Sequence, residues 1–176
     1  NAQRIECSGL GEIFTAAGDA TDLDACLAAY DKQLGRTALF DTVFVDAPCS
    51  GTGTMRRHGE IPWRLAPQEC DRDLPELQLE LLREAARRVG AGGQLVYATC
   101  SVLHAENEGV VTAFLSSPEG AGFAPMPLSV ALADASPAYA DAAEDIAAHE
   151  TPAGAFQSYP CDGGFDGHFC VRFIRV

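Results

Sequence analysis

"FDTVFVDAPCSGTG", residues 40 to 53, starts with an apolar run rich in β-branched and aromatic residues and ends in a loop of small residues. The run is typical of a strand buried on both faces, whereas Pro48 and the glycines exclude regular structure in the loop. A similar pair occurs in "QLVYATCSV", residues 94 to 102, where the apolar run ends at Cys100. Two strands, each followed by a cysteine, therefore organise the predicted fold.

Helical patterns accompany these strands. "CLAAYDKQLG", residues 26 to 35, predicts a helix that Gly35 closes. A longer helix is expected after a capping Asp73, with Pro75 in its first turn and an end at Gly90, Gly92 and Gly93. Its expected apolar face consists of Leu77, Leu81, Ala85 and Val89. Residues 104 to 117 predict another helix, with acidic residues in its first turn.

Shorter patterns surround this unit. Residues 12 to 17 predict a short strand that turns at Gly18 and Asp19, and "HFCVRFIRV", residues 168 to 176, predicts a final strand. Residues 117 to 160 are acidic and have little to bury, so we expect a partly mobile excursion there. The alternation of helices with apolar strands predicts one α/β domain over residues 1–176, with a mostly parallel sheet.

Composition restricts the class of protein. The 176 residues carry a net charge of −13, which argues against a simple nucleic-acid binder. Seven of the twelve Lys and Arg residues nevertheless lie between residues 56 and 88, so one segment is locally basic. No apolar stretch reaches the roughly 18 residues of a membrane span, and the first residues do not resemble a signal peptide. We expect a cytoplasmic protein with no membrane partner.

The seven cysteines are odd in number and include no C-x-x-C pair, which disfavours a disulfide framework and a metal site. Cys49 and Cys100 differ from the rest because each follows a predicted strand. Ligands of open α/β sheets bind beyond the carboxyl ends of the strands, so both thiols should face one crevice. Packing is the commoner role of a cysteine, and position alone leaves both roles open. We expect packing for the other five: Cys7, Cys26, Cys70, Cys161 and Cys170.

Three segments together resemble the Sun/Fmu-type (NOL/NOP/Sun) RNA (cytosine-5)-methyltransferases, especially their bacterial ribosomal branch. They are "DAPCSGTGTMRRHGEIPW" (46–63), "RDLPELQLELL" (72–82) and "GGQLVYATCSVLHAENEGVV" (92–111), and the resemblance returns at "DGHFCVRFIRV" (166–176). It implies a Rossmann-like fold, S-adenosylmethionine as cofactor and RNA as partner, with ribosomal RNA preferred to transfer RNA. It implies no metal.

The resemblance also implies roles for single residues. Cys100 would attack carbon 6 of a cytosine, which activates carbon 5, and Cys49 would act in release or as a general base. Asp46 would contact the base edge near the methyl donor. The Pro48 carbonyl would contact the exocyclic amine of the base. Asp19 would hold the adenine of the cofactor, although both aspartates could instead serve in turns.

Basic residues after the first cysteine motif are candidates for contacts with RNA phosphates. They are Arg56, Arg57, His58 and Arg64. The alternative is a solvated loop with scattered charge.

The sequence departs from the family at its start, where the strands carrying the glycine-rich loop and the ribose-binding acid have no counterpart. We therefore expect the C-terminal portion of a larger catalytic domain, inactive or weak without the missing N-terminal region. A transfer RNA enzyme and a noncatalytic RNA-binding or assembly module remain alternatives. A methyltransferase acting on the amino group of adenine is a further one. The paired thiols argue against the last two, because neither function requires cysteines at these positions.

Overall fold

The computed structural model describes residues 13–161 and 165–176. The chain divides into two compact units, Asn1–Ala38 and Leu39–Val176, and each is described by itself. The described part of the first unit contains helix α2 (Leu23–Leu34). The Asp22 side chain caps its start by accepting from the Ala25 amide, and Gly35 ends it at a φ of 68°. Glycine adopts this left-handed conformation without strain, so the predicted helix and its end are confirmed.

The strand predicted at residues 12–17 is wrong as far as it is described, since residues 13–17 are irregular and residue 12 lies outside the described residues. An extended segment becomes a strand only when it pairs, and none of the described residues pairs with it. The predicted turn is present, with the Asp22 amide donating to the Asp19 carbonyl over 3.0 Å.

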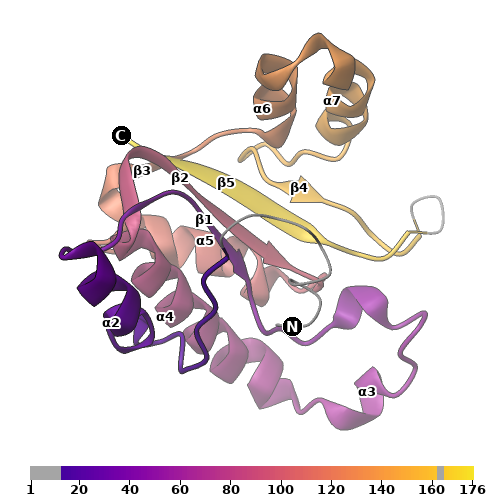
Figure 1. Cartoon of the computed structure of the whole chain (residues 1–176). Helices are drawn as coiled ribbons and strands as arrows, with labels where there is room; N and C mark the ends of the chain where they lie inside the picture. The colour runs from indigo at the N-terminus through magenta and orange to yellow at the C-terminus, as the bar shows by residue number, and fades with distance from the viewer. Residues whose placement is uncertain (1–12, 162–164) are drawn as a thin grey trace. The chain divides into compact units, whose positions relative to one another are not determined.

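The second unit is built on a mixed sheet (Figure 1). Its strands are β1 (Phe40–Asp46), β2 (Val89–Thr99), β3 (Phe123–Pro125), β4 (Phe156–Gln157) and β5 (Phe169–Arg175). The order is β1-β2-β5-β3, with β4 also paired to β5. The first pair, β1 with β2, is parallel as expected, and the pairs that involve β5 are antiparallel. The last strand of the sequence thus lies inside the sheet.

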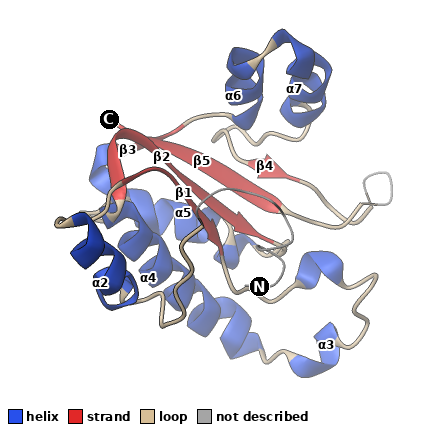
Figure 2. Ribbon diagram, viewed as in Figure 1, coloured by secondary structure: helices blue, strands red, loops and turns tan. Residues whose placement is uncertain are grey.

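Helices α4 (Leu74–Arg87) and α5 (Glu108–Leu115) pack on one face of this sheet (Figure 2). The core between them contains the fully buried Leu82, Tyr97, Phe114, Phe169 and Phe173. The short helix α3 (Ile61–Arg64) follows the loop after β1. Helix α5 is shorter than the predicted 104–117, because a 3₁₀ turn occupies His104–Glu106.

The buried face of α4 differs from the predicted one. It consists of Gln78, Leu82, Ala85 and Ala86, while Leu77 is exposed and Val89 already belongs to β2. The helix has two overlapping apolar stripes, and the sheet packs on the one through Leu82 and Ala86. A polar residue, Gln78, is carried into the interior because it lies one turn before Leu82.

The ends of α4 also differ from the prediction. The helix stops at Arg87, before the glycines, which lie within β2. Asp73 occupies the N-cap position without capping, because it is itself helical (φ −65°, ψ −42°) at the end of a π-helical turn, Glu69–Asp73, that leads into α4.

Strand β1 has the predicted bounds but is not buried on both faces, since Phe44 is 61 % exposed. Helix α4 and strand β2 cover part of it. Among the described residues no strand pairs with its other edge, so β1 is an edge strand in this sheet.

The acidic excursion carries regular structure. Helices α6 (Leu128–Ala135) and α7 (Ala140–Ala147) pack against each other, and β3 and β4 add to the sheet. The amide and hydroxyl of Ser129 donate to the Glu150 carboxylate over 2.9 and 2.7 Å, which ties the start of α6 to the segment after α7. Alanine favours helix, which explains order in a segment with little to bury. Mobility of this segment stays a prediction.

Candidate active site

The carboxyl ends of β1 and β2 place two thiols side by side. Asp46 in β1 and Ala98 in β2 are register partners at the end of the parallel pair, and a loop follows each strand. Cys49 and Cys100 lie on these loops with their Sγ atoms 3.3 Å apart, at hydrogen-bonding distance between free thiols. Two residues that are 51 positions apart in sequence therefore share one site.

Burial changes the acidity of Cys49. Burial, reinforced by the hydrogen bond with Cys100, raises the pKa of Cys49 well above its ordinary value. Cys49 therefore keeps its proton at neutral pH and can donate it to the neighbouring sulfur.

Three buried hydroxyl groups join the two loops below the thiols. The oxygen of Ser50 lies 3.1 Å from that of Thr52 and 3.2 Å from that of Ser101, and the last two are 3.1 Å apart. The amides of Val102 and Leu103 donate to this cluster over 3.1 and 3.0 Å. The residues beside both cysteines are thus fixed by side chains that lose no hydrogen bonds on burial.

A third segment, directly before β5, is hydrogen-bonded to the same loops, and we call the contacts among Gly53, Cys100 and Gly167 the lock. The Gly53 amide donates to the Cys100 carbonyl, and the Gly167 amide donates to the Gly53 carbonyl, each over 2.9 Å. A β-carbon at Gly53 would lie 2.0 Å from the Gly167 oxygen, so only glycine fits.

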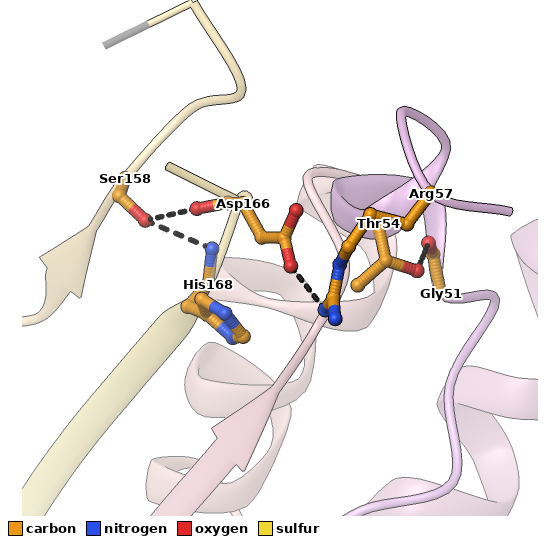
Figure 3. A network of polar contacts seen from close by, with 6 residues as sticks. All are labelled: Gly51, Thr54, Arg57, Ser158, Asp166 and His168. Atoms are coloured by element: carbon orange, nitrogen blue, oxygen red, sulfur yellow. Dashed lines mark hydrogen bonds and ion pairs between the residues drawn. The ribbon is translucent and has the colours of Figure 1, made fainter. Parts of the chain in front are cut away.

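Figure 3 shows the polar contacts around this lock. Arg57 pairs with Asp166, and the Ser158 hydroxyl donates to the Asp166 carbonyl over 3.0 Å. The His168 amide donates to the Ser158 hydroxyl over 3.0 Å, and the Thr54 hydroxyl donates to the Gly51 carbonyl over 2.8 Å. The loop after β1 and the approach to β5 are therefore connected by side chains as well as by backbone.

Sequence reasoning missed several residues that build the site. Asn107 is fully buried, where its side chain accepts from the Thr99 hydroxyl over 2.7 Å and donates to the Ser101 carbonyl over 2.9 Å. Glu106, which the sequence places in the first turn of a helix, is fully buried and accepts from the Ser50 amide. Gln78 is the third buried polar residue that sequence reasoning missed. An uncharged polar residue within the stretch "LQLELL", residues 77 to 82, could have indicated it.

The other predicted site residues are spread over the surface. Asp46 and Pro48 are exposed beside Cys49, and the Pro48 carbonyl accepts from Gln78 over 2.9 Å. Arg56, His58 and Arg64 are exposed on the following loop and on α3. Asp19 belongs to the first unit, where its Oδ1 accepts from the amide and hydroxyl of Thr21 over 3.0 and 2.7 Å. These two bonds lower the pKa of Asp19. The functional roles of all these residues stay predictions.

The cysteines expected to pack have different environments. Cys26, Cys70 and Cys170 are partly buried, whereas Cys161 is exposed, so packing is wrong for Cys161. It lies in the turn after β4, outside the core. Cys7 lies outside the described residues.

A cavity of about 530 Å³ lies apart from the thiol pair, among α7, β4 and residues 165–168. Its lining includes His149, Phe156 and His168 but neither Cys49 nor Cys100. In residues 13–161 and 165–176, no cluster of His, Cys, Asp and Glu could hold a metal ion. The helices described there are all too short or too polar to cross a bilayer.

Comparison with known proteins supports one family. A family model described as "16S rRNA methyltransferase RsmB/F" matches residues 1–174. Ribosomal RNA small subunit methyltransferase B of Thermus thermophilus is 38 % identical over 135 residues, which are 76 % of this chain and 29 % of that protein. The protein of the same name from Proteus mirabilis is 44 % identical over 92 residues, 52 % of this chain and 22 % of that protein. The chain thus spans less than a third of these relatives.

Solved structures support the fold. The structure "Crystal Structure of PH0851" superposes with a TM-score of 0.72 at 27 % identity, over 98 % of this chain and 33 % of that one. NSun6 from Pyrococcus horikoshii with SFG superposes with a TM-score of 0.69 at 20 % identity, over 99 % of this chain and 38 % of that one. The expected Rossmann-like methyltransferase fold is confirmed.

Proposed function

Because this chain belongs to the 16S rRNA methyltransferase RsmB/F family, we propose that the protein containing it methylates carbon 5 of a cytosine in ribosomal RNA. S-Adenosylmethionine would be the methyl donor, and the cytoplasm the location. The observation that carries this proposal is the 3.3 Å separation of Cys49 and Cys100 at the carboxyl ends of adjacent parallel strands. Carbon 5 of cytosine needs covalent activation, and a thiolate can supply it reversibly.

In the proposed cycle, the Cys100 thiolate adds to carbon 6 and the electron pair of the double bond moves toward carbon 5. Carbon 5 then accepts the methyl group. Elimination removes the proton from carbon 5, restores the double bond and breaks the bond between carbon 6 and Cys100. Cys49 assists by donating its own proton to the departing sulfur and taking up the proton from carbon 5. Both thiols are then protonated, and loss of one proton from Cys100 to solvent restores the starting thiolate, so atoms and charges balance.

The raised pKa of Cys49 fits a thiol that donates a proton, while the assignment of the attack to Cys100 comes from the resemblance to the family. A thiol that keeps its proton is a poor nucleophile, and its conjugate base is a strong proton acceptor. The short Sγ–Sγ distance allows both proton movements without a rearrangement of the loops.

Within the second unit, Asp46 fits a cofactor site, and S-adenosylmethionine would supply an electrophilic methyl group there. Asp46 is an exposed carboxylate at the carboxyl end of β1, where ligands of such sheets bind. Asp19 uses one carboxylate oxygen in both of its bonds with Thr21, which leaves Oδ2 for an amino group. We propose contacts of Asp46 with both the base and the donor, and of Asp19 with adenine.

We propose that the RNA backbone is bound by the exposed loop after Cys49. Arg56, His58 and Arg64 lie there with exposed side chains, and Arg57, 64 % exposed, keeps surface free beside its pair with Asp166. Such cations suit phosphates and position the strand rather than select a base.

The test uses the full-length protein and RNA that carries 5-fluorocytosine at the target. Fluorine on carbon 5 blocks the elimination, so the wild type should form a stable covalent adduct and Cys100→Ala should form none. An adduct that persists in Cys100→Ala would refute the assignment of the nucleophile. Cys49→Ala should accumulate an adduct on ordinary RNA, whereas Cys170→Ala, a control thiol in β5, should turn over normally. If an adduct formed only on transfer RNA, the proposed substrate would change from ribosomal RNA to transfer RNA.

A further inference from the structure

Two buried polar side chains hold the backbone on either side of Cys49. Gln78, from α4, donates through Nε2 to the Pro48 carbonyl over 2.9 Å. Glu106, from the turn before α5, accepts through Oε2 from the Ser50 amide over 2.9 Å. Both side chains are fully buried. The residues directly before and after Cys49 are therefore anchored to two different elements of the core.

The two anchors are connected to each other and to the sheet. Gln78 Nε2 lies 3.3 Å from Glu106 Oε2. The Glu106 carbonyl accepts from the hydroxyl of the fully buried Tyr97, in β2, over 2.6 Å. Since β2 leads directly into Cys100, the position of Cys49 is set relative to the same strand that carries Cys100.

This arrangement is not explained by stability alone. Gln78 Oε1 and Glu106 Oε1 are buried and have no hydrogen-bond partner among residues 13–161 and 165–176. A buried acceptor without a donor is destabilising, and apolar side chains of similar size would avoid that loss. Local rules are broken in this way mainly where function requires a fixed geometry. The geometry fixed here is the loop Pro48–Ser50.

We propose that Gln78 and Glu106 are positioning residues that hold Cys49 at bonding distance from Cys100. This inference rests on the proposed function, in which Cys49 assists release of the enzyme from the product. Without the anchors, the loop moves away from Cys100, and release slows by about 100-fold, as expected for a misplacement of about 1 Å. Attack by Cys100 does not depend on these contacts, so covalent intermediate accumulates on ordinary RNA.

The experiment compares Gln78→Met, Glu106→Leu and Glu106→Gln in the full-length protein. Methionine fills the volume of Gln78 without its donor, leucine removes the acceptor of Glu106, and glutamine keeps an acceptor for the Ser50 amide. Ser117→Ala is the matched control. Ser117 is 4 % exposed at the end of α5, where its hydroxyl donates to the Phe114 carbonyl and accepts from the Gly120 amide. Its loss removes buried hydrogen bonds without touching either loop.

The first readout needs neither RNA nor cofactor. Alkylation of Cys49 by iodoacetamide, followed by mass spectrometry, should be faster in Gln78→Met and Glu106→Leu, because a loop without its anchor at Pro48 or Ser50 exposes a thiol that is otherwise partly buried. Glu106→Gln and Ser117→Ala should react like the wild type. If folded Gln78→Met and Glu106→Leu alkylate no faster than Ser117→Ala, the inference is overturned. Should Glu106→Leu fail to fold, Gln78→Met decides alone.

The second readout is trapped adduct on ordinary RNA. Gln78→Met should accumulate it as Cys49→Ala does, and Glu106→Gln should not. Normal turnover by Gln78→Met would also overturn the inference. If instead the wild type forms no adduct even with 5-fluorocytosine, the proposed function fails, and the alkylation result still decides whether Cys49 is positioned.

Discussion

The lock at Gly53 gives the sharpest prediction for stability. In Gly53→Ala the new β-carbon would lie 2.0 Å from the Gly167 oxygen and 2.9 Å from the Cys100 oxygen, where real contacts stay beyond 3.0 Å. The approach to β5 must therefore retreat by about 1 Å, which breaks the 2.9 Å bond from the Gly167 amide to the Gly53 carbonyl.

The expected loss combines that hydrogen bond, about 1 kcal/mol, with overpacking of about 1–3 kcal/mol, so roughly 2–4 kcal/mol in total. In a protein of this size or larger this corresponds to a decrease in Tm of roughly 4–16 °C. Gly59→Ala is the control in the same loop, because no atom lies within 4 Å of its added β-carbon and its φ is not left-handed. That change should leave Tm unchanged or raise it by stiffening the unfolded chain.

The assay is thermal unfolding of both variants and the wild type at one scan rate, followed by circular dichroism. Equal Tm values for Gly53→Ala and Gly59→Ala would refute the contact between the three segments. Gly167→Ala should lower Tm as well, because its added β-carbon would lie 2.6 Å from Val102. A decrease in Tm for Gly53→Ala alone would therefore also count against the contact between the three segments.

Two further predictions concern a buried thiol and a helix start. Burial raises the pKa of Cys170 to about 11, so above pH 9 the unfolded chain loses a proton that the folded protein retains. Stability should fall between about pH 8.5 and pH 11 more steeply in the wild type than in Cys170→Ala, and parallel pH profiles of Tm would refute this. Glu150→Ala should cost about 1 kcal/mol and speed amide exchange in α6, because Glu150 holds the Ser129 amide and hydroxyl. Unchanged exchange there would show that the contact does not stabilise the helix.

Sequence patterns predicted the strands that lead to the two thiols, but not which side chains around them are buried. The β-branched run 40–46 and the strand ending before Cys100 follow from period and composition, which are local properties. Exposure of Phe44 is not local, because it depends on whether another strand pairs with β1.

The choice between overlapping apolar stripes explains the largest gap in the predicted site. Leu77 and Leu81 form a regular helical stripe, and only the packing of α4 on the sheet shows that Gln78 faces inward instead. The position of Glu106 in an expected first helical turn is similarly uninformative about burial, since acidic residues favour helix starts whether or not they are buried. The partners that bury it, Ser50 and Gln78, are 56 and 28 residues away, beyond the range of any local pattern.

The place of β5 in the sheet has a consequence for how the protein folds during synthesis. This strand lies between β2 and β3, and Gly167, directly before it, completes the lock on Gly53 and Cys100. The contacts of β5 with β2 and of Gly167 with Gly53 join residues at least 70 positions apart, so they form late, after long loops have closed. A nascent chain that has reached α7 already has both thiols, the hydroxyl cluster and the anchors Gln78 and Glu106, but not Gly167. The contact of Gly167 with the loop of Cys49 is therefore made only when the start of β5 is present, so it is the last of these supports to join the site.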